Sequence, residues 1–134
     1  MAIEYRLERD GAVVLAQAQG VLTLGCFTHL QQRLRDDSGL RAIHSTLLDL
    51  RFVTDIQLTE SDLAKIAQAL TACQKKLGVH KLAIVARDEQ SFALGNKYAS
   101  IEKGVKEDVI VFFHMEVARR WLGIESPQLV DIAS

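Results

Sequence analysis

The sequence predicts one α/β domain in which a central, mixed but mostly parallel sheet is flanked by helices. Short apolar segments that suit buried strands alternate along its 134 residues with longer amphipathic segments that suit helices. Two strand-like segments joined by a tight turn come first and add an N-terminal β-hairpin to the parallel part. The predicted order is β-β-α-β-α-β-α-β-α, with right-handed crossovers between the parallel strands.

The hairpin is predicted from the first 20 residues. Apolar and charged residues alternate over residues 3–8, which is the period of a half-buried strand. Asp10 and Gly11 tolerate the positive φ angles of a tight turn. Residues 12–18 then predict the returning strand, and we expect Gly20 to end it.

The first helix and the middle strand follow. Apolar residues at spacings of three and four predict a helix over 24–35, with Thr23 as its N-cap. Residues 45–50 are short and mostly apolar, as in a strand covered on both faces. Residues 51–58 are too polar for the core and predict a loop.

The clearest helix begins at Thr59. Thr59 caps it, and Asp62 stands three residues further on, which is close to a capping box. Cys73 falls on its apolar stripe, where a thiol behaves as a small hydrophobic side chain. Gly78 predicts the end of this helix.

The C-terminal half repeats the alternation. Strands are predicted at 82–86 and 109–113, and helices at 88–104 and 115–122. Gly95 interrupts the first of these helices, where we expect it to allow close contact with the sheet.

The domain is expected to span residues 1–123. Gly123 stops the last helix, and Trp121 on its inward side is expected to anchor that helix to the sheet. Residues 124–134 hold the single proline of the chain and predict a loose tail.

Charge and cysteine content bear on partners and compartment. Sixteen basic and seventeen acidic residues give a net charge of −1, which argues against nucleic acid or an anionic membrane as the main partner. Cys26 and Cys73 are too few for a disulfide framework and suit a reducing cytosol. The N-terminus lacks the apolar core of a signal peptide, and no apolar run approaches the ~20 residues of a membrane span. We therefore expect a cytoplasmic protein.

Several local strings, in this order and spacing, resemble the STAS family, whose fold is that of bacterial anti-sigma-factor antagonists. The match is nearer to small single-domain bacterial proteins of the stage II sporulation protein AA-like type. The strings occupy residues 20–23, 47–53, 82–85, 111–112 and 118–123.

The resemblance implies a regulatory or binding module without a catalytic centre. Its best-known members bind an anti-sigma kinase and are switched by phosphorylation of a serine, preceded by aspartate, at the start of the helix after the middle strand. No Asp-Ser pair occurs at this place in the sequence. Thr59 and Ser61 are the hydroxyl residues nearest to it and are the candidate phosphoacceptors.

Motifs for catalysis, metal binding and nucleotide binding are missing. The four histidines have neither HxH nor HExxH spacing, and the sequence contains no GxSxG, GxGxxG or P-loop string. We therefore expect no catalytic residue, no metal and no cofactor.

Topology indicates one place for a site. In open α/β sheets, ligands and partners bind at the carboxyl ends of the strands, and a helix N-terminus there accepts anions. The candidate binding residues at this edge are Arg51, Thr54, Asp55, Thr59, Ser61, Arg87 and Asp88.

The leading hypothesis is a non-enzymatic module of the STAS-like type that docks a protein partner or a small apolar or anionic ligand. The alternative is a small-ligand carrier or an enzyme with a pocket between the helices and the sheet. A third possibility is a self-associating subunit that forms a homodimer.

Overall fold

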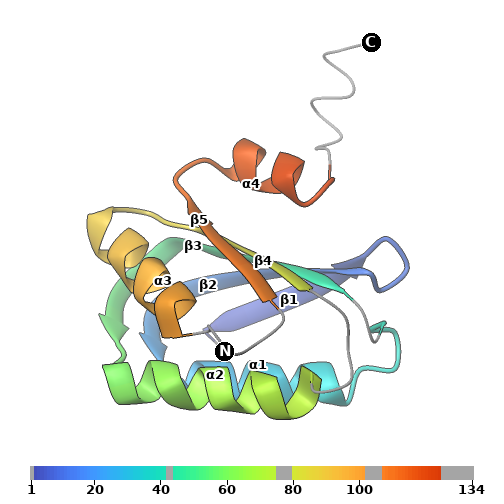
Figure 1. Cartoon of the computed structure of the whole chain (residues 1–134), viewed down its shortest axis with the longest axis horizontal. Coiled ribbons are helices and arrows are strands. Elements are labelled where there is room, and N and C mark those ends of the chain that lie inside the picture. Colours follow the sequence, from blue (N-terminus) through green and yellow to red (C-terminus); the bar gives the residue numbers. More distant parts are fainter. Residues whose placement is uncertain (1, 42–43, 75–79, 102–106, 125–134) are drawn as a thin grey trace.

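The computed structural model describes residues 2–41, 44–74, 80–101 and 107–124. Strands and helices alternate in the predicted order (Figure 1). The strands are β1 (Ile3–Glu8), β2 (Val13–Thr23), β3 (Ser45–Gln57), β4 (His80–Val85) and β5 (Glu107–Phe112). The helices are α1 (Leu24–Arg35), α2 (Glu60–Gln74), α3 (Glu89–Ile101) and α4 (Met115–Trp121).

The sheet has the simple strand order β1-β2-β3-β4-β5. β1 is antiparallel to β2, and every other neighbouring pair is parallel. Each parallel strand is added on the same side of the previous one, so right-handed crossovers place α1, α2 and α3 on one face. α4 lies on the opposite face (Figure 1). The fold class is therefore the predicted one, with most of the helical cover on a single face.

The main core lies between the sheet and α1–α3. Val14, Leu22 and Leu48 from the strands meet Leu30 from α1 and Leu63 from α2 in this cluster. A smaller cluster lies beneath α4, where buried side chains of β3, β4 and α4 meet; it contains Leu47, Ala83, Val85 and Ala118. Burial of these apolar side chains supplies most of the driving force for folding.

The prediction that Gly20 ends the second strand is wrong. β2 continues to Thr23, and Gly20 lies within it at a φ of +73°. The pairing register with β3 shifts between Gln17 and Gln19 and again between Gly20 and Val21. The glycine therefore allows an irregularity inside a long strand, because it adopts a positive φ at little cost.

The prediction of a loop over 51–58 is also wrong. β3 continues to Gln57 because the second half of β2 pairs with it, from Gln19 opposite Phe52 to Thr23 opposite Gln57. Only Val53 is fully buried along this extension, so most of its side chains are polar or exposed. The polar residues here face solvent from a two-stranded ribbon whose buried side chains, Leu22 and Val53, belong to the main core.

Of the two predicted N-caps, the one at α2 is confirmed and the one at α1 makes no capping hydrogen bond. The capping box of α2 is confirmed, since the Asp62 amide donates to the Thr59 hydroxyl (3.1 Å) and the Thr59 amide donates to the Asp62 carboxylate (3.0 Å). Thr23 occupies the N-cap position of α1 but makes no side-chain capping hydrogen bond. Its hydroxyl instead lies 3.3 Å from the thiol of Cys26.

Other predicted boundaries are confirmed to within a few residues. The hairpin turn has positive φ angles at residues 9–11. Gly123 ends α4 at a φ of +75°, and its amide donates to the Arg120 carbonyl (3.0 Å) while the Ile124 amide donates to that of Arg119 (2.8 Å). Gly78, the Cys73 side chain and residues 125–134 lie outside the described part.

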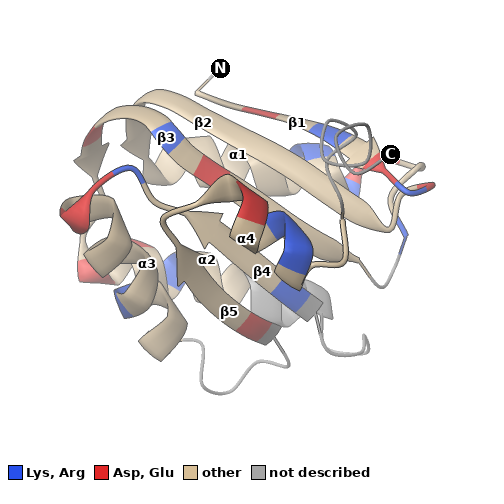
Figure 2. Cartoon of the chain, turned by 90° about the horizontal axis from the view of Figure 1, so that it is seen from above, with Lys and Arg blue, Asp and Glu red and all other residues tan. Residues whose placement is uncertain are grey.

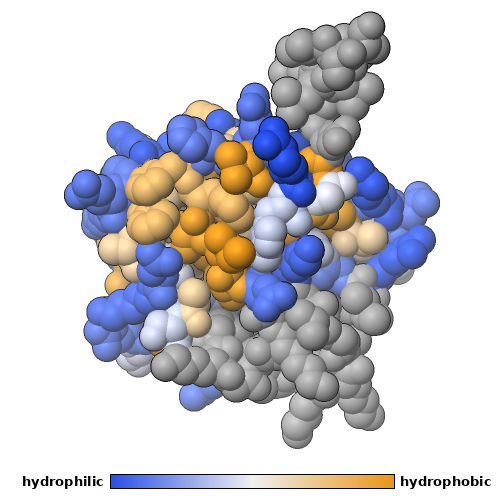
Figure 3. Space-filling view, turned by 45° about the horizontal axis from the view of Figure 1, so that its top comes forward, coloured by the Kyte–Doolittle hydropathy of each residue, from blue (hydrophilic) through white to orange (hydrophobic). Residues whose placement is uncertain are grey.

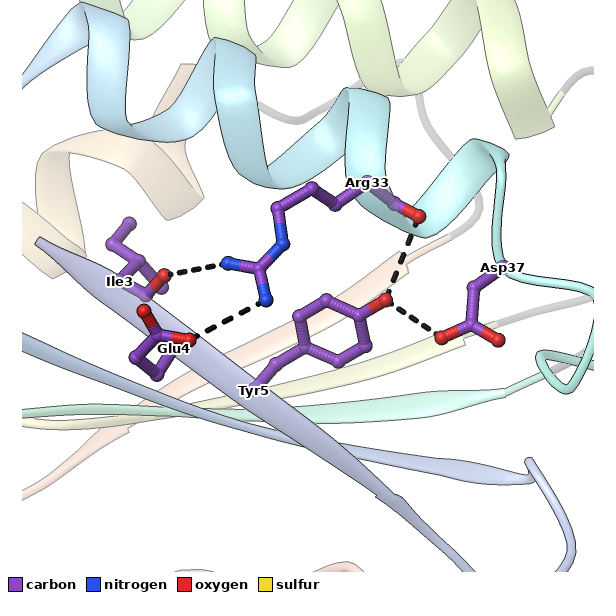
Figure 4. A network of polar contacts seen from close by, with 5 residues as sticks. All are labelled: Ile3, Glu4, Tyr5, Arg33 and Asp37. Carbon is purple, nitrogen blue, oxygen red and sulfur yellow. Dashed lines mark hydrogen bonds and ion pairs between the residues drawn. The ribbon is translucent and has the colours of Figure 1, made fainter. Parts of the chain in front are cut away.

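Polar contacts attach α1 to the edge strand β1 (Figure 4). The Tyr5 hydroxyl donates to the Asp37 carboxylate at 2.6 Å, and Arg33 donates to the Ile3 carbonyl at 3.2 Å. The Arg33 guanidinium also lies over the Tyr5 ring and pairs with Glu4. The hydrogen bond to Asp37 raises the pKa of Tyr5, and the hydrogen bond from Tyr5 lowers the pKa of Asp37.

Gly95 allows α3 to lie close to β5, as expected. A Cβ atom at this position would lie 2.8 Å from Cγ2 of Val111, closer than side chains approach. We expect Gly95→Val to lower the free energy of unfolding by about 1.5 kcal/mol, through overpacking that outweighs its better helix propensity. Urea unfolding measures this. Val111→Ala in the same chain should recover most of the loss, and equal losses in both backgrounds would contradict the close contact.

Candidate functional site

β3 extends well past the end of its neighbour β4. The last residue pair between them is Asp49 opposite Val85, whereas β3 continues to Gln57. The chain leaves β4 at this point, turns through Arg87 and Asp88, and begins α3. The unpaired side of β3 therefore faces the start of α3, and we call this place the overhang edge.

A pocket of about 100 Å³ lies at the overhang edge. It is lined by Leu50, Val53, Thr54, Asp55, Ile56, Arg87, Asp88, Gln90 and Ser91. Arg87 crosses it, and its Nη1 donates to the Val53 carbonyl at 2.7 Å. β4 has ended here and cannot pair with this carbonyl, so the guanidinium satisfies it instead.

The start of α3 is held by Asp88 and Ser91. Ser91 is 2% exposed, and its hydroxyl accepts from the amides of Arg87 (2.9 Å) and Asp88 (3.1 Å). The Ser91 amide donates to the Asp88 carboxylate at 2.9 Å. Hydrogen bonds from the Ser91 amide and hydroxyl lower the pKa of Asp88, so this carboxylate is charged at neutral pH.

The rim of the overhang edge is acidic. Asp55, Asp88 and Glu89 are exposed there. Glu60, at the start of α2, is exposed as well, and a hydrogen bond from Lys97 of α3 lowers its pKa. Figure 2 shows acidic segments at the end of the molecule where α3 begins. The exposed charges here are therefore mostly negative, beside the cations Arg87 and Lys97.

The structure brings four of the seven predicted site residues together. Thr54, Asp55, Arg87 and Asp88 all line the pocket. Thr59 and Ser61 lie at the beginning of α2 and are exposed, outside the described lining of the pocket. The Thr59 hydroxyl accepts the capping hydrogen bond of α2.

The placement of Arg51 at this edge is wrong. Residues 51–57 belong to β3, and the register with β2 shifts between Asp49 and Phe52, so Arg51 does not share a face with Val53. Arg51 lies on the α4 face of the sheet and forms an ion pair with Asp49, which is 3% exposed. Its Nε and Nη2 donate to the two carboxylate oxygens at 3.0 and 2.9 Å. The hydrogen bond to Asp49 raises the pKa of Arg51. Both residues line a shallow groove of about 480 Å³ on that face, together with Arg119.

An apolar cavity of about 120 Å³ lies between the sheet and α1–α3. Its walls are almost wholly aliphatic and aromatic, with polar groups from Gln31, His44, Thr46 and Tyr98. Sequence periodicity predicted which side chains face this core but gave no sign of unfilled space. An apolar cavity of about 150 Å³ can stay dry and bind benzene, so this volume suits a small apolar molecule.

The cavity predicts a contrast between two alanines of β2. Ala16 lines the cavity, whereas the equally buried Ala18 is not part of its described lining. We expect Ala16→Leu to leave the melting temperature unchanged or higher, because the added methyl groups enter existing space. Ala18→Leu should cost about 2 kcal/mol through overpacking. Thermal and urea unfolding compare them, and equal losses would contradict the cavity.

Other predicted features are located as follows. Trp121 is partly buried against the small core cluster, and its ring centroid lies 5.8 Å from that of Phe112. Among the described residues, no three His, Cys, Asp or Glu side chains group as metal ligands. No helix in the same part of the chain is long and apolar enough to cross a membrane.

Sequence reasoning missed Ser91 and Gln90 at the overhang edge. Asp88 at the start of the predicted helix is an N-cap signal, but it does not single out Ser91. Nothing in the sequence indicates that Arg87 reaches the Val53 carbonyl, since 34 residues separate them.

Comparison with known proteins identifies the fold. No family model matches the sequence, and no curated protein matches it. Solved structures do match. The anti-sigma factor antagonist SpoIIAA in its unphosphorylated form superposes with a TM-score of 0.59 over 93% of this chain and 100% of that chain, at 7% identity.

An uncharacterised protein of the DUF3478 family from Shewanella loihica, which has a SpoIIAA-like fold, gives a TM-score of 0.55 at 20% identity. It covers 90% of this chain and 92% of its own. The chain therefore has the SpoIIAA-like, or STAS-like, fold that the sequence resemblance implied.

Proposed function

We propose that this chain is a non-enzymatic regulatory module that docks a protein partner at the overhang edge. The single observation that carries the proposal is the pocket there, where β3 runs past β4 beside the start of α3. The two solved structures compared above share the fold, and one of them is that of an anti-sigma factor antagonist. The two isolated cysteines support a cytoplasmic setting.

The chemistry of the rim supports a partner with a basic surface. The acidic residues Asp55, Asp88 and Glu89 are exposed to solvent, whereas the guanidinium of Arg87 donates a hydrogen bond to the Val53 carbonyl. Complementary charge accelerates encounter and selects among partners. The exposed residue Thr54 adds a hydroxyl beside these charges.

A photo-crosslinking amino acid tests the docking site directly. Placed at Thr54 and expressed in the source cell, it should form a covalent adduct with a protein that mass spectrometry identifies. The same residue at Gln32, exposed on α1, serves as the control. Adducts of equal yield from both positions, or none from Thr54, would contradict docking at this edge.

The regulatory part of the proposal has two further tests. Turnover of a substrate by the purified chain, in a broad hydrolase and transferase screen, would contradict a non-enzymatic role. Phosphate on Thr59 or Ser61 in protein isolated from the cell would support a phosphorylation switch. The Thr59 hydroxyl caps α2, so a phosphate there would also alter the start of that helix.

A second candidate function, carriage of a small apolar ligand, is favoured by the apolar cavity between the sheet and α1–α3. Benzene is a suitable probe for a cavity of this size and lining. Binding should raise the melting temperature and shift the NMR signals of the cavity methyl groups, and Ala16→Leu should abolish both effects. Unchanged spectra of the wild-type chain in benzene would rule against this candidate.

A further inference from the structure

The two edges of the sheet differ in chemistry. β1 forms one edge, and its side chains on the α4 face are charged: Glu4, Arg6 and Glu8. Charged side chains on an edge strand oppose pairing with another chain. β5 forms the other edge, and after Asp108 its described residues are all apolar. Charged side chains therefore protect the β1 edge against pairing with another chain, whereas most of the described β5 edge has no such charges.

Exposed apolar side chains surround the β5 edge. Ile110 in β5 is 40% exposed. Phe113, just after the end of β5, is 47% exposed, and Val117 in α4 is 45% exposed. The Phe113 ring stacks on Phe92 of α3 with the centroids 4.5 Å apart. We call Phe92, Ile110, Phe113 and Val117 the β5 patch. Figure 3 shows a broad apolar area on the side of the molecule that carries β5. Such patches mark interaction sites.

Within the described part of the chain, no hydrogen bond engages the backbone groups of β5 that point away from β4. The Phe112 carbonyl accepts from the Ala86 amide, so the backbone of Phe112 faces inward to the chain that continues from β4. Backbone groups of alternate residues point to opposite sides of a strand. Ile110 therefore also faces β4, and the amides and carbonyls of Val109 and Val111 face outward.

We propose that a second copy of this chain pairs with β5 in antiparallel fashion, about a two-fold axis at Ile110, to form a homodimer. The run from Val109 to Val111 reads the same in both directions. A two-fold axis at Ile110 thus places Val109 opposite Val111 of the second copy. The outward backbone groups of both copies then meet as hydrogen-bonded pairs.

The side chains and charges fit the same arrangement. Ile110 meets its own counterpart in a close, non-hydrogen-bonded pair, which buries both exposed side chains. The acidic residues Glu107 and Asp108 precede the apolar run, so the antiparallel arrangement places the two acidic ends apart. The Asp108 residues of the two copies would lie about 13 Å from each other along the strands, beyond the screening length of physiological salt. A parallel arrangement would instead set acid against acid.

Sedimentation equilibrium of the full chain tests the proposal. The wild-type chain is expected to sediment as a dimer. Ile110→Lys, which sets like charges opposite each other, should raise the dissociation constant by about 100-fold or more. Val21→Lys is the matched control, because Val21 is similarly exposed on β2, away from β5, and should leave the dimer intact. A wild-type monomer at every soluble concentration, or a dimer that Ile110→Lys leaves intact, would overturn the proposal.

A disulfide test reports the register independently of stability. In a Cys26→Ser, Cys73→Ser background, Ile110→Cys should form an intermolecular disulfide rapidly, because Cα atoms of such a pair lie about 4.5 Å apart. Val117→Cys, equally exposed in the same patch, should cross-link at least about tenfold more slowly, since it lies away from the axis. Equal rates for the two variants would overturn the two-fold axis at Ile110.

Discussion

Replacing Arg51 with alanine is expected to lower the free energy of unfolding by about 3 kcal/mol. Asp49 is 3% exposed in the wild-type chain, and the change leaves its carboxylate with the amide of residue 51 and the distant side-chain amide of Gln17 (3.5 Å) as the donors among the described residues. Leaving one buried charge unpaired lowers the free energy of unfolding by far more than the intact ion pair raises it. Urea unfolding followed by circular dichroism measures the loss.

Two further variants separate the charge from the packing. Arg51→Lys keeps the positive charge but cannot form both hydrogen bonds in one plane, so an intermediate loss of about 1 kcal/mol is expected. Asp49→Ala combined with Arg51→Ala removes both charges and should recover most of the stability. A loss below about 0.5 kcal/mol for Arg51→Ala, which is typical of surface substitutions, would contradict the paired arrangement.

Reversing charge at the overhang edge is expected to weaken partner binding by about 100-fold at low salt. Asp55→Lys together with Glu89→Lys turns the acidic rim basic, so a basic partner would meet like charge. Most of the loss should appear in the association rate and shrink as salt is added, because both residues are exposed. Calorimetry and stopped-flow kinetics measure these effects with the purified partner protein that the photo-crosslinking experiment identifies.

A matched variant isolates the local effect from net charge. Asp36→Lys together with Glu116→Lys changes the total charge by the same amount, at exposed positions on α1's end and on α4. This control should retain affinity within about threefold of wild type. If both double variants lose affinity equally, the rim does not select the partner.

Features set by nearby residues could be predicted from the sequence. The Thr59–Asp62 capping box and the Gly123 helix end each depend on a short pattern. The order of elements was predicted for the same reason, because each helix and strand carries its own period. The STAS-like fold followed from that order together with the family resemblance.

Features that depend on distant partners could not be predicted. Residues 51–57 look like a loop because the strand that pairs with them, β2, lies about 30 positions earlier and is itself irregular at Gly20. The error placed Arg51 at the overhang edge, whereas the structure has it on the α4 face beside Asp49. The apolar cavity likewise depends on how three helices pack over the sheet.

Amide hydrogen exchange tests the docking proposal most directly. It compares the free chain with its non-covalent complex with the partner protein that photo-crosslinking identifies. The proposal predicts slower exchange in the complex over residues 53–57 and 87–91, with unchanged exchange in β1 and at the β5 edge. Protection confined to the groove around Asp49, to the β5 patch or to the cavity lining would contradict docking at the overhang edge.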